Sequence, residues 1–175
     1  MMENTLTYKG YFTNIKYSAE DNVLYGKIEG IDDLVTFESE SSLEIEKQIN
    51  DLHTNVGDIV RIAELSENFV KYIKKEVEQE LYFKEDVIEK LKEMLALLNS
   101  QFESVKKLVL DENLEITIDK IEENEEQVDD MRRNLIADHI DRLKQGKCRP
   151  ENNTIFINLV ANLERIGDHI YYIAR

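Results

Sequence analysis

The sequence of 175 residues has one cysteine, one proline and no tryptophan. The single cysteine, Cys148, has no partner for a disulfide within the chain, which indicates a reducing compartment, and we expect the cytoplasm. One proline argues against long disordered linkers. The sequence has no run of about 18 apolar residues, and its N-terminus lacks a basic region followed by an apolar stretch. We therefore expect neither direct membrane insertion nor secretion.

Positive charge is also scarce, because 22 Lys and Arg stand against 37 Asp and Glu and give a formal net charge of −15 at pH 7. Such a surface repels nucleic-acid phosphates and anionic lipid headgroups, so no nucleic-acid partner is expected. Cationic partners or bound metal ions fit this charge, and so does a plain solubilising surface on exposed helices.

The first 38 residues alternate between apolar and polar side chains as β-strands do. Three runs, 6–17, 23–28 and 34–37, are separated by the turn-forming segments 19–22 and 30–33. This pattern predicts a small three-stranded antiparallel β-meander. Such a sheet is marginal alone and needs a helix on one of its faces.

From Ser41 or Ser42, either of which suits an N-cap, the apolar period changes to about 3.6 residues and continues to Arg175. Apolar stripes predict four helices, over 43–77, 87–109, 121–143 and 159–170. Gly57 is a weak point in the first, and Gly146 is a left-handed cap for the third. The expected fold class is α+β, a mainly helical antiparallel bundle with the meander at its N-terminus, in domains 1–42 and 43–175.

Two helical segments also resemble each other. DIVRIAELSENF, which begins at Asp58, overlies NLERIGDHIYYI, which begins at Asn162, at an offset of about 104 residues. Arg61 then matches Arg165. Two related helices at this distance indicate a duplicated helical unit rather than a short solenoid repeat.

Two pairs of carboxylates have E-x-x-x-D spacing: Glu125 with Asp129, and Glu164 with Asp168. Residues four apart share a helix face, and both pairs lie beside apolar positions, so they are directed toward neighbouring helices. Like charges held so close are unfavourable unless a cation neutralises them. Iron, manganese, magnesium or zinc bridging two helices would do so, with histidine as a further ligand (His139 or His169).

Two alternatives to a metal site stay open for these carboxylates. An acidic chain contains E-x-x-x-D spacings by chance, and Arg132 or Arg165 could pair with them in ordinary salt bridges. An enzyme is not expected, because the three histidines have no nearby Ser or Cys nucleophile motif and the chain has no glycine-rich phosphate loop.

Three ordered segments resemble a known family: 64–94, EEQVDDMRRNLIADHIDRLKQGKC over 125–148, and LERIGDHIYYIA over 163–174. They look like PhoU and the PhoU-like cytoplasmic domains of bacterial sodium/phosphate cotransporters, and the cotransporter-associated branch is closer because of DHIDRLKQGKC. The resemblance covers about 48–175. It implies a bundle of two pseudo-repeated three-helix units, metal clusters held by E-x-x-x-D motifs, and restraint of phosphate uptake and signalling.

Carried over by position, the resemblance makes Glu125, Asp129, Glu164 and Asp168 the metal-binding carboxylates for a divalent or ferric ion. It also implies a phosphate transporter or its signalling proteins as partners, and a cytoplasmic location peripheral to a membrane transporter. The first repeat departs from the pattern, because Val60 replaces the motif Glu. The start of that repeat is missing, and the apolar surface so exposed leads us to expect a homodimer.

The N-terminal segment, about 5–45, resembles another family, the HicB antitoxins. The resemblance is carried by 8–11, 18–21, Gly26, Gly30 and Ile31 with Asp33, and Phe37 with Glu38. It implies a β-sheet that binds and blocks a toxin. The leading hypothesis is thus a non-enzymatic regulator of phosphate transport. The alternative is an antitoxin or protein-interaction module that sequesters a small basic toxin.

Overall fold

The computed structural model describes residues 5–8, 10–32, 34–110 and 114–175. The chain forms two compact units, Met1–Val56 and Gly57–Arg175, and helix α1 (Ser42–Glu78) contributes residues to both. The expected α+β fold class, with an N-terminal antiparallel sheet and a helical bundle, is confirmed. The expected domain boundary after residue 42 stays a prediction. Two positions of the HicB resemblance, Lys9 and Asp33, lie outside the described residues.

The first unit contains an antiparallel sheet of strands β1 (Thr5–Tyr8), β2 (Tyr11–Asn14), β3 (Lys16–Ser18), β4 (Val23–Glu29) and β5 (Thr36–Ser39). β2 and β3 pair with the same edge of β4 in one register, with Thr13 opposite Ile28 and Lys16 opposite Tyr25. They therefore act as one strand interrupted at Ile15. β5 pairs with the other edge of β4, and β1 pairs with β2.

The sheet has five strands rather than the predicted three, because the first run, 6–17, forms a hairpin of β1 and β2 and a further short strand, β3. Tyr8 pairs with Tyr11, and Gly10 between the two strands has a φ of +89°. Glycine adopts this conformation readily since it has no Cβ. The sequence signal for this reversal was Gly10 itself, which stands between the apolar residues Tyr8 and Tyr11.

The start of α1 supplies the helix that the sheet needs. Ile45 and Ile49 of α1 pack on Ile28 of β4 and form the buried core of this unit. The backbone N–H of Glu44 donates to Oγ of Ser41 at 3.3 Å, which confirms Ser41 as the N-cap. Each element thus buries an apolar face that would be exposed if it stood alone.

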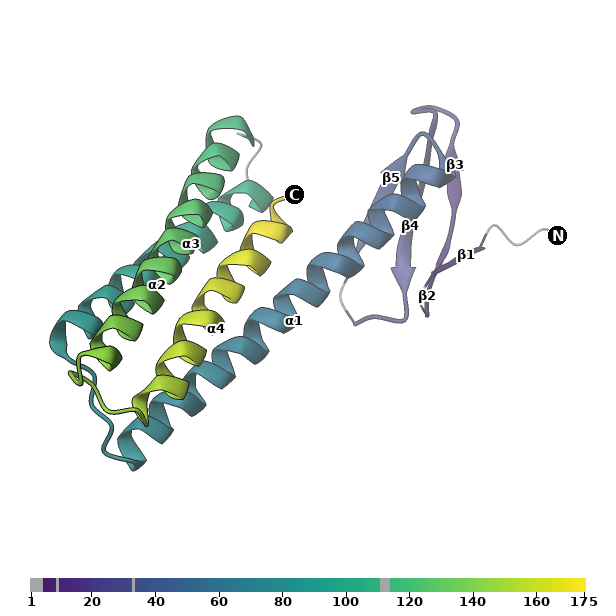
Figure 1. The fold of residues 1–175 in the computed structure, drawn as a ribbon. Helices are drawn as coiled ribbons and strands as arrows, with labels where there is room; N and C mark the ends of the chain where they lie inside the picture. Colours follow the sequence, from purple (N-terminus) through teal and green to yellow (C-terminus); the bar gives the residue numbers. More distant parts are fainter. Residues whose placement is uncertain (1–4, 9, 33, 111–113) are drawn as a thin grey trace. The chain divides into compact units, whose positions relative to one another are not determined.

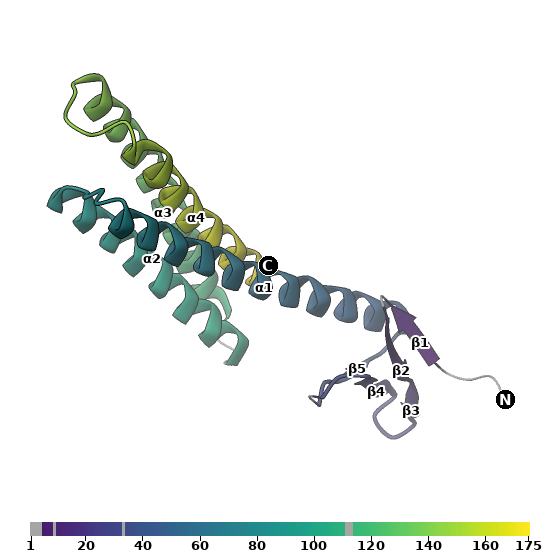
Figure 2. The same cartoon turned by 90° about the horizontal axis from the view of Figure 1, so that it is seen from below.

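The second unit is a bundle of α1 from Gly57 onward, α2 (Glu85–Leu110), α3 (Leu114–Lys144) and α4 (Asn152–Ile173), so the four predicted helices are confirmed. Figures 1 and 2 show α4, in yellow, running beside the second half of α1. α4 carries the centre of the core, Phe156, Val160 and Leu163, which packs with Leu65 of α1 and Met94 of α2. None of these described helices is both long and apolar enough to span a bilayer.

The end of α3 has the left-handed cap that the sequence predicted. Gly146 has a φ of +66°. The N–H of Lys147 donates to the carbonyl of Arg142 at 2.8 Å, and the N–H of Gly146 donates to the carbonyl of Leu143 at 3.0 Å. These two bonds form a Schellman motif. The motif turns the chain toward the start of α4.

A side chain added at two helical glycines, Gly57 and Gly167, should change the stability of the protein in opposite directions. Gly57 of α1 has nothing within 4 Å of the position a Cβ would take, so Gly57→Ala should stabilise the protein by about 0.5–1 kcal/mol. At Gly167 of α4 a Cβ would lie 3.1 Å from Leu98 Cδ2 and 3.4 Å from Val128 Cγ1. Gly167→Val should therefore destabilise by about 1–3 kcal/mol. Chemical denaturation followed by circular dichroism measures both, and equal effects would contradict the close packing at Gly167.

Candidate metal centre

Three of the four predicted carboxylates converge between α3 and α4. Glu125 and Asp129 of α3 and Asp168 of α4 each place a ligand oxygen within 4.8 Å of the others, and all three are partly buried. The four-residue spacing puts Glu125 and Asp129 on one face of α3. Gly167 allows the approach of α4, since its missing side chain would contact Val128. Asp168 follows Gly167 directly and is thereby brought to the α3 carboxylates.

The electrostatics of this group are unfavourable without a cation. Burial raises the pKa of Glu125, and repulsion from Asp129 and Asp168 raises it further. Burial also raises the pKa of Asp168, followed by repulsion from Asp129, while His169 and Arg132 oppose the shift. Negative charge is therefore concentrated in a place that water solvates poorly.

Glu164, the fourth predicted carboxylate, is not part of this group. Its Oε1 lies 3.7 Å from Nε of Arg132, and its side chain is 18% exposed. Burial raises the pKa of Glu164, repulsion from Asp168 adds to this, and Arg132 lowers it. The salt-bridge alternative thus holds for this residue. Glu164 still acts on the group, because its charge contributes to the raised pKa of Glu125.

The histidines considered as further ligands lie elsewhere. His169 Nδ1 is 2.7 Å from Asp58 Oδ1, which ties α4 to α1. His139 stacks on Phe156 with ring centroids 4.4 Å apart. Neither belongs to the carboxylate group within the part of the chain that the structure describes. The Asp58–His169 contact was missed because its members are 111 residues apart and no local pattern links them.

A second residue that sequence reasoning missed is Gln101 of α2. It is fully buried, and its Nε2 donates to the carbonyl oxygen of Gly167 at 3.3 Å. This bond holds α4 next to α2 at the residue that precedes Asp168. A glutamine among apolar positions such as Leu98 and Val105 was the available signal, because a polar residue on a buried face needs a partner.

The corresponding part of the first repeat does not form a site. Val60 stands at the position of the motif Glu and is 53% exposed. Glu64 bonds instead with Arg61 at 2.7 Å on the surface of the same helix. Among the described residues, the acidic, histidine and cysteine side chains give one group of three with the spacing of metal ligands.

The three converging carboxylates fit a metal ion that prefers oxygen ligands. All three offer carboxylate oxygens, the hard ligands that magnesium, manganese and iron accept. Zinc more often takes nitrogen or sulfur, which this group lacks. A divalent or ferric cation would neutralise the repulsion that raises the pKa values of Glu125 and Asp168. When bound, it would supply a charge-compensating link between α3 and α4.

The raised pKa values predict how stability depends on pH without metal. A carboxyl whose pKa is higher in the folded state binds more protons there than in the unfolded state, so stability falls as pH rises from the ordinary values, 3.8 and 4.5, through the raised ones. Asp168→Asn should therefore raise the melting temperature at pH 7 in a chelator.

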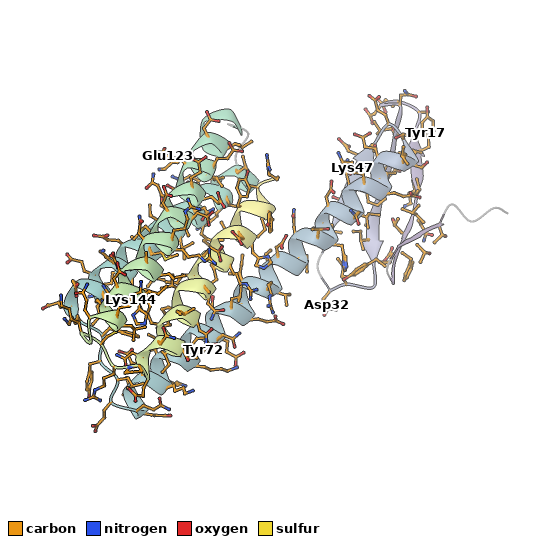
Figure 3. All side chains as sticks on the ribbon, viewed as in Figure 1. Tyr17, Asp32, Lys47, Tyr72, Glu123 and Lys144 are labelled. Carbon is orange, nitrogen blue, oxygen red and sulfur yellow. The ribbon has the colours of Figure 1, made fainter. Side chains whose placement is uncertain are left out.

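The matched control is Glu123→Gln, an exposed residue of α3 labelled in Figure 3, which should leave the melting temperature nearly unchanged. Thermal denaturation from pH 4 to 7.5 provides the measurement. A loss of stability in Asp168→Asn equal at all pH values would mean that the carboxylate stabilises the apoprotein.

Comparison with protein families shows that residues 91–175 fit the PhoU domain. Neither the comparison with curated proteins nor that with solved structures gave a match. All members of the carboxylate group lie within the matched segment. The assignment to the cotransporter-associated branch and the HicB resemblance stay predictions. The segment that holds the carboxylate group is therefore similar to the PhoU domain.

Proposed function

We propose that this chain is a non-enzymatic regulator of phosphate transport whose PhoU-like domain holds a divalent or ferric ion between α3 and α4. The observation that carries the proposal is the convergence of Glu125, Asp129 and Asp168 inside the matched segment. Its partner would be a phosphate transporter or the signalling proteins of that transporter, met in the cytoplasm at the membrane surface.

The geometry favours a structural and regulatory ion. The ligands come from two helices whose carboxylates repel each other, so binding of the ion stabilises the bundle by the free energy of that binding. Glu164 lies at the edge of the group, and the Nε of Arg132 beside it has no hydrogen bond among the described residues. This loose ion pair leaves Glu164 able to turn toward a bound cation as a fourth ligand.

Elemental analysis of the purified protein tests the ion. Wild type should carry about one equivalent of metal, as expected for a site with three carboxylate ligands. The double variant Asp129→Asn, Asp168→Asn should lose it. The variant Glu123→Gln removes one charge from α3 outside the group and should keep the metal. Metal-free wild type that gains no thermal stability from magnesium, manganese or iron would exclude a metal at this group.

A homodimer is the second part of the proposal, and it is supported by an exposed stripe on α1. Ile59, Val70, Ile73 and Val77 are exposed at spacings of three, four and eleven residues, which place them along one side of the helix. Leu65 and Phe69 pack into the bundle instead. Apolar residues in such a row are those that one helix presents to another.

Light scattering after size-exclusion chromatography tests the homodimer. Val70→Glu combined with Val77→Glu should convert a dimer to a monomer, because each places a charge in the apolar stripe. Lys74→Glu, on an exposed position between them, should leave the dimer intact. A wild-type protein that runs as a monomer at all concentrations would refute this part of the proposal.

One observation supports the antitoxin alternative. The face of the sheet opposite Ile28 presents Phe12 and Tyr25 as exposed aromatic residues, beside the carboxylates of Glu29 and Glu38. Aromatic residues with acidic neighbours suit a small basic protein partner. A small basic ribonuclease encoded beside this chain would favour this alternative, whereas a membrane phosphate transporter encoded there would favour the first proposal.

A further inference from the structure

A basic pocket lies at the end of the bundle where the α1–α2 and α3–α4 connections meet (Figure 1). Its volume is about 230 Å³. Four cationic side chains, Lys84, Arg142, Lys147 and Arg149, line it together with one carboxylate, Glu80. In a chain with a net charge of −15, such an excess of positive charge in one cavity is unexpected from composition. None of these residues belongs to the carboxylate group.

Three of the residues that line the pocket have a buried polar atom without a hydrogen-bond partner among the described residues. His139 is 2% exposed, and its Nε2 has no hydrogen bond among the described residues. Nη2 of Arg142 and Oδ1 of Asn152 are also buried atoms without a hydrogen bond among the described residues. Buried polar groups nearly always have a partner, because leaving water without one is costly. Three such atoms around one cavity indicate a ligand.

The start of α4 adds a favourable field for an anion. The helix begins at Asn152 and runs for 22 residues. Glu151 at its N-cap makes no side-chain cap bond, and the first turn has no acidic residue. The N–H groups of Asn152 and Asn153 donate to the carbonyls of Arg149 and Pro150, so this end attracts an anion through the partial positive charge of the helix dipole. Asn152 itself lines the pocket.

Two carboxylates of α3 that flank His139 and Arg142 in the sequence are paired with lysines, although Asp138 also interacts with the charge of Arg142. Asp138 accepts a hydrogen bond from Nζ of Lys90 at 2.8 Å, and Asp141 pairs with Lys144 at 3.4 Å. Glu80 is thus the carboxylate that opposes the four cations in the pocket lining. The balance of charge still favours an anion.

We propose that this pocket binds one phosphate group as dihydrogen phosphate. Arg142 and Lys147 would donate to its oxygens, as guanidinium and ammonium groups do in phosphate sites. Its two P–OH groups would donate to the two buried acceptors, Nε2 of His139 and Oδ1 of Asn152. Sulfate has no O–H at neutral pH, so it would leave both acceptors unpaired and bind more weakly.

The state of His139 agrees with a role as acceptor. Burial lowers the pKa of His139, and the charge of Arg142 lowers it further, so the ring is neutral at pH 7. A hydrogen bond with Asn153 occupies its other ring nitrogen. A neutral imidazole that donates from one nitrogen accepts at the other.

This inference goes beyond the proposed function, because it concerns a second site and does not require the metal. Isothermal titration calorimetry of the full chain with inorganic phosphate tests it, in a chelator and at constant ionic strength so that neither bound metal nor screening changes the result. Parallel titrations with sulfate and with glycerol 3-phosphate compare a non-protonated anion and a phosphate ester.

Two variants remove pocket cations: Lys147→Gln, an exposed residue, and Arg142→Gln, which is partly buried. Each should weaken phosphate binding by about tenfold, the loss expected for one charge-assisted bond. The matched control is Lys144→Gln, which removes the same charge from the end of α3 outside the pocket lining and is labelled in Figure 3. It should bind phosphate within about twofold of wild type, as for surface charges of little energetic weight.

Three outcomes would overturn the proposal: no heat of binding for phosphate up to the order of 10 mM, equal affinity for sulfate, or equal losses in Lys147→Gln and Lys144→Gln. Binding of glycerol 3-phosphate as tightly as phosphate would identify a phosphate ester as the ligand, and preference for inorganic phosphate would identify the free ion. Asp168→Asn should bind phosphate as wild type does, so a failure of the metal centre and a failure of this pocket are separately visible.

Discussion

The close packing of α4 against α2 and α3 at Gly167 is the constraint on which the rest of the second unit depends. A side chain there would contact Leu98 and Val128, so glycine sets how closely the helices approach. Gln101 fixes the same point by donating to the Gly167 carbonyl. The bundle core, centred on Phe156 and Leu163, forms around this contact. The carboxylates converge because the backbone beside them is held this tightly.

Charge in this protein is distributed unevenly along α4. The helix begins at a pocket lined by cationic side chains, and more than four turns further on it carries Asp168, whose pKa is raised, as is that of Glu125. Each arrangement is unfavourable alone, because like charges are held together, and at the carboxylates they are also partly buried. A ligand of the opposite sign would offset each, the proposed cation at the carboxylates and the proposed anion at the pocket. Helix α4 thus contributes to two proposed sites that favour ligands of opposite charge.

In the first unit the sheet and the start of α1 likewise bury each other's apolar faces. A sheet this small is stable only with a helix on one side, and α1 supplies Ile45 and Ile49 for that purpose. α1 continues through Gly57 into the second unit without a break. In the second unit α1 leaves apolar residues such as Val70 and Val77 exposed, and they are not part of the bundle core. Association with a partner would remove them from water.

The sequence by itself determined the helices, the Gly146 cap and the α+β class, and it narrowed the first N-cap to Ser41 or Ser42, because periodicity and capping are local properties. The E-x-x-x-D spacing also named the carboxylates that share a face of α3. Only the tertiary structure decided that Asp168 joins them while Glu164 pairs with Arg132, and that Asp58 meets His169. The basic pocket was equally hidden, since its lining comes from the ends of three helices. Such contacts depend on how the helices cross, which no spacing along the chain records.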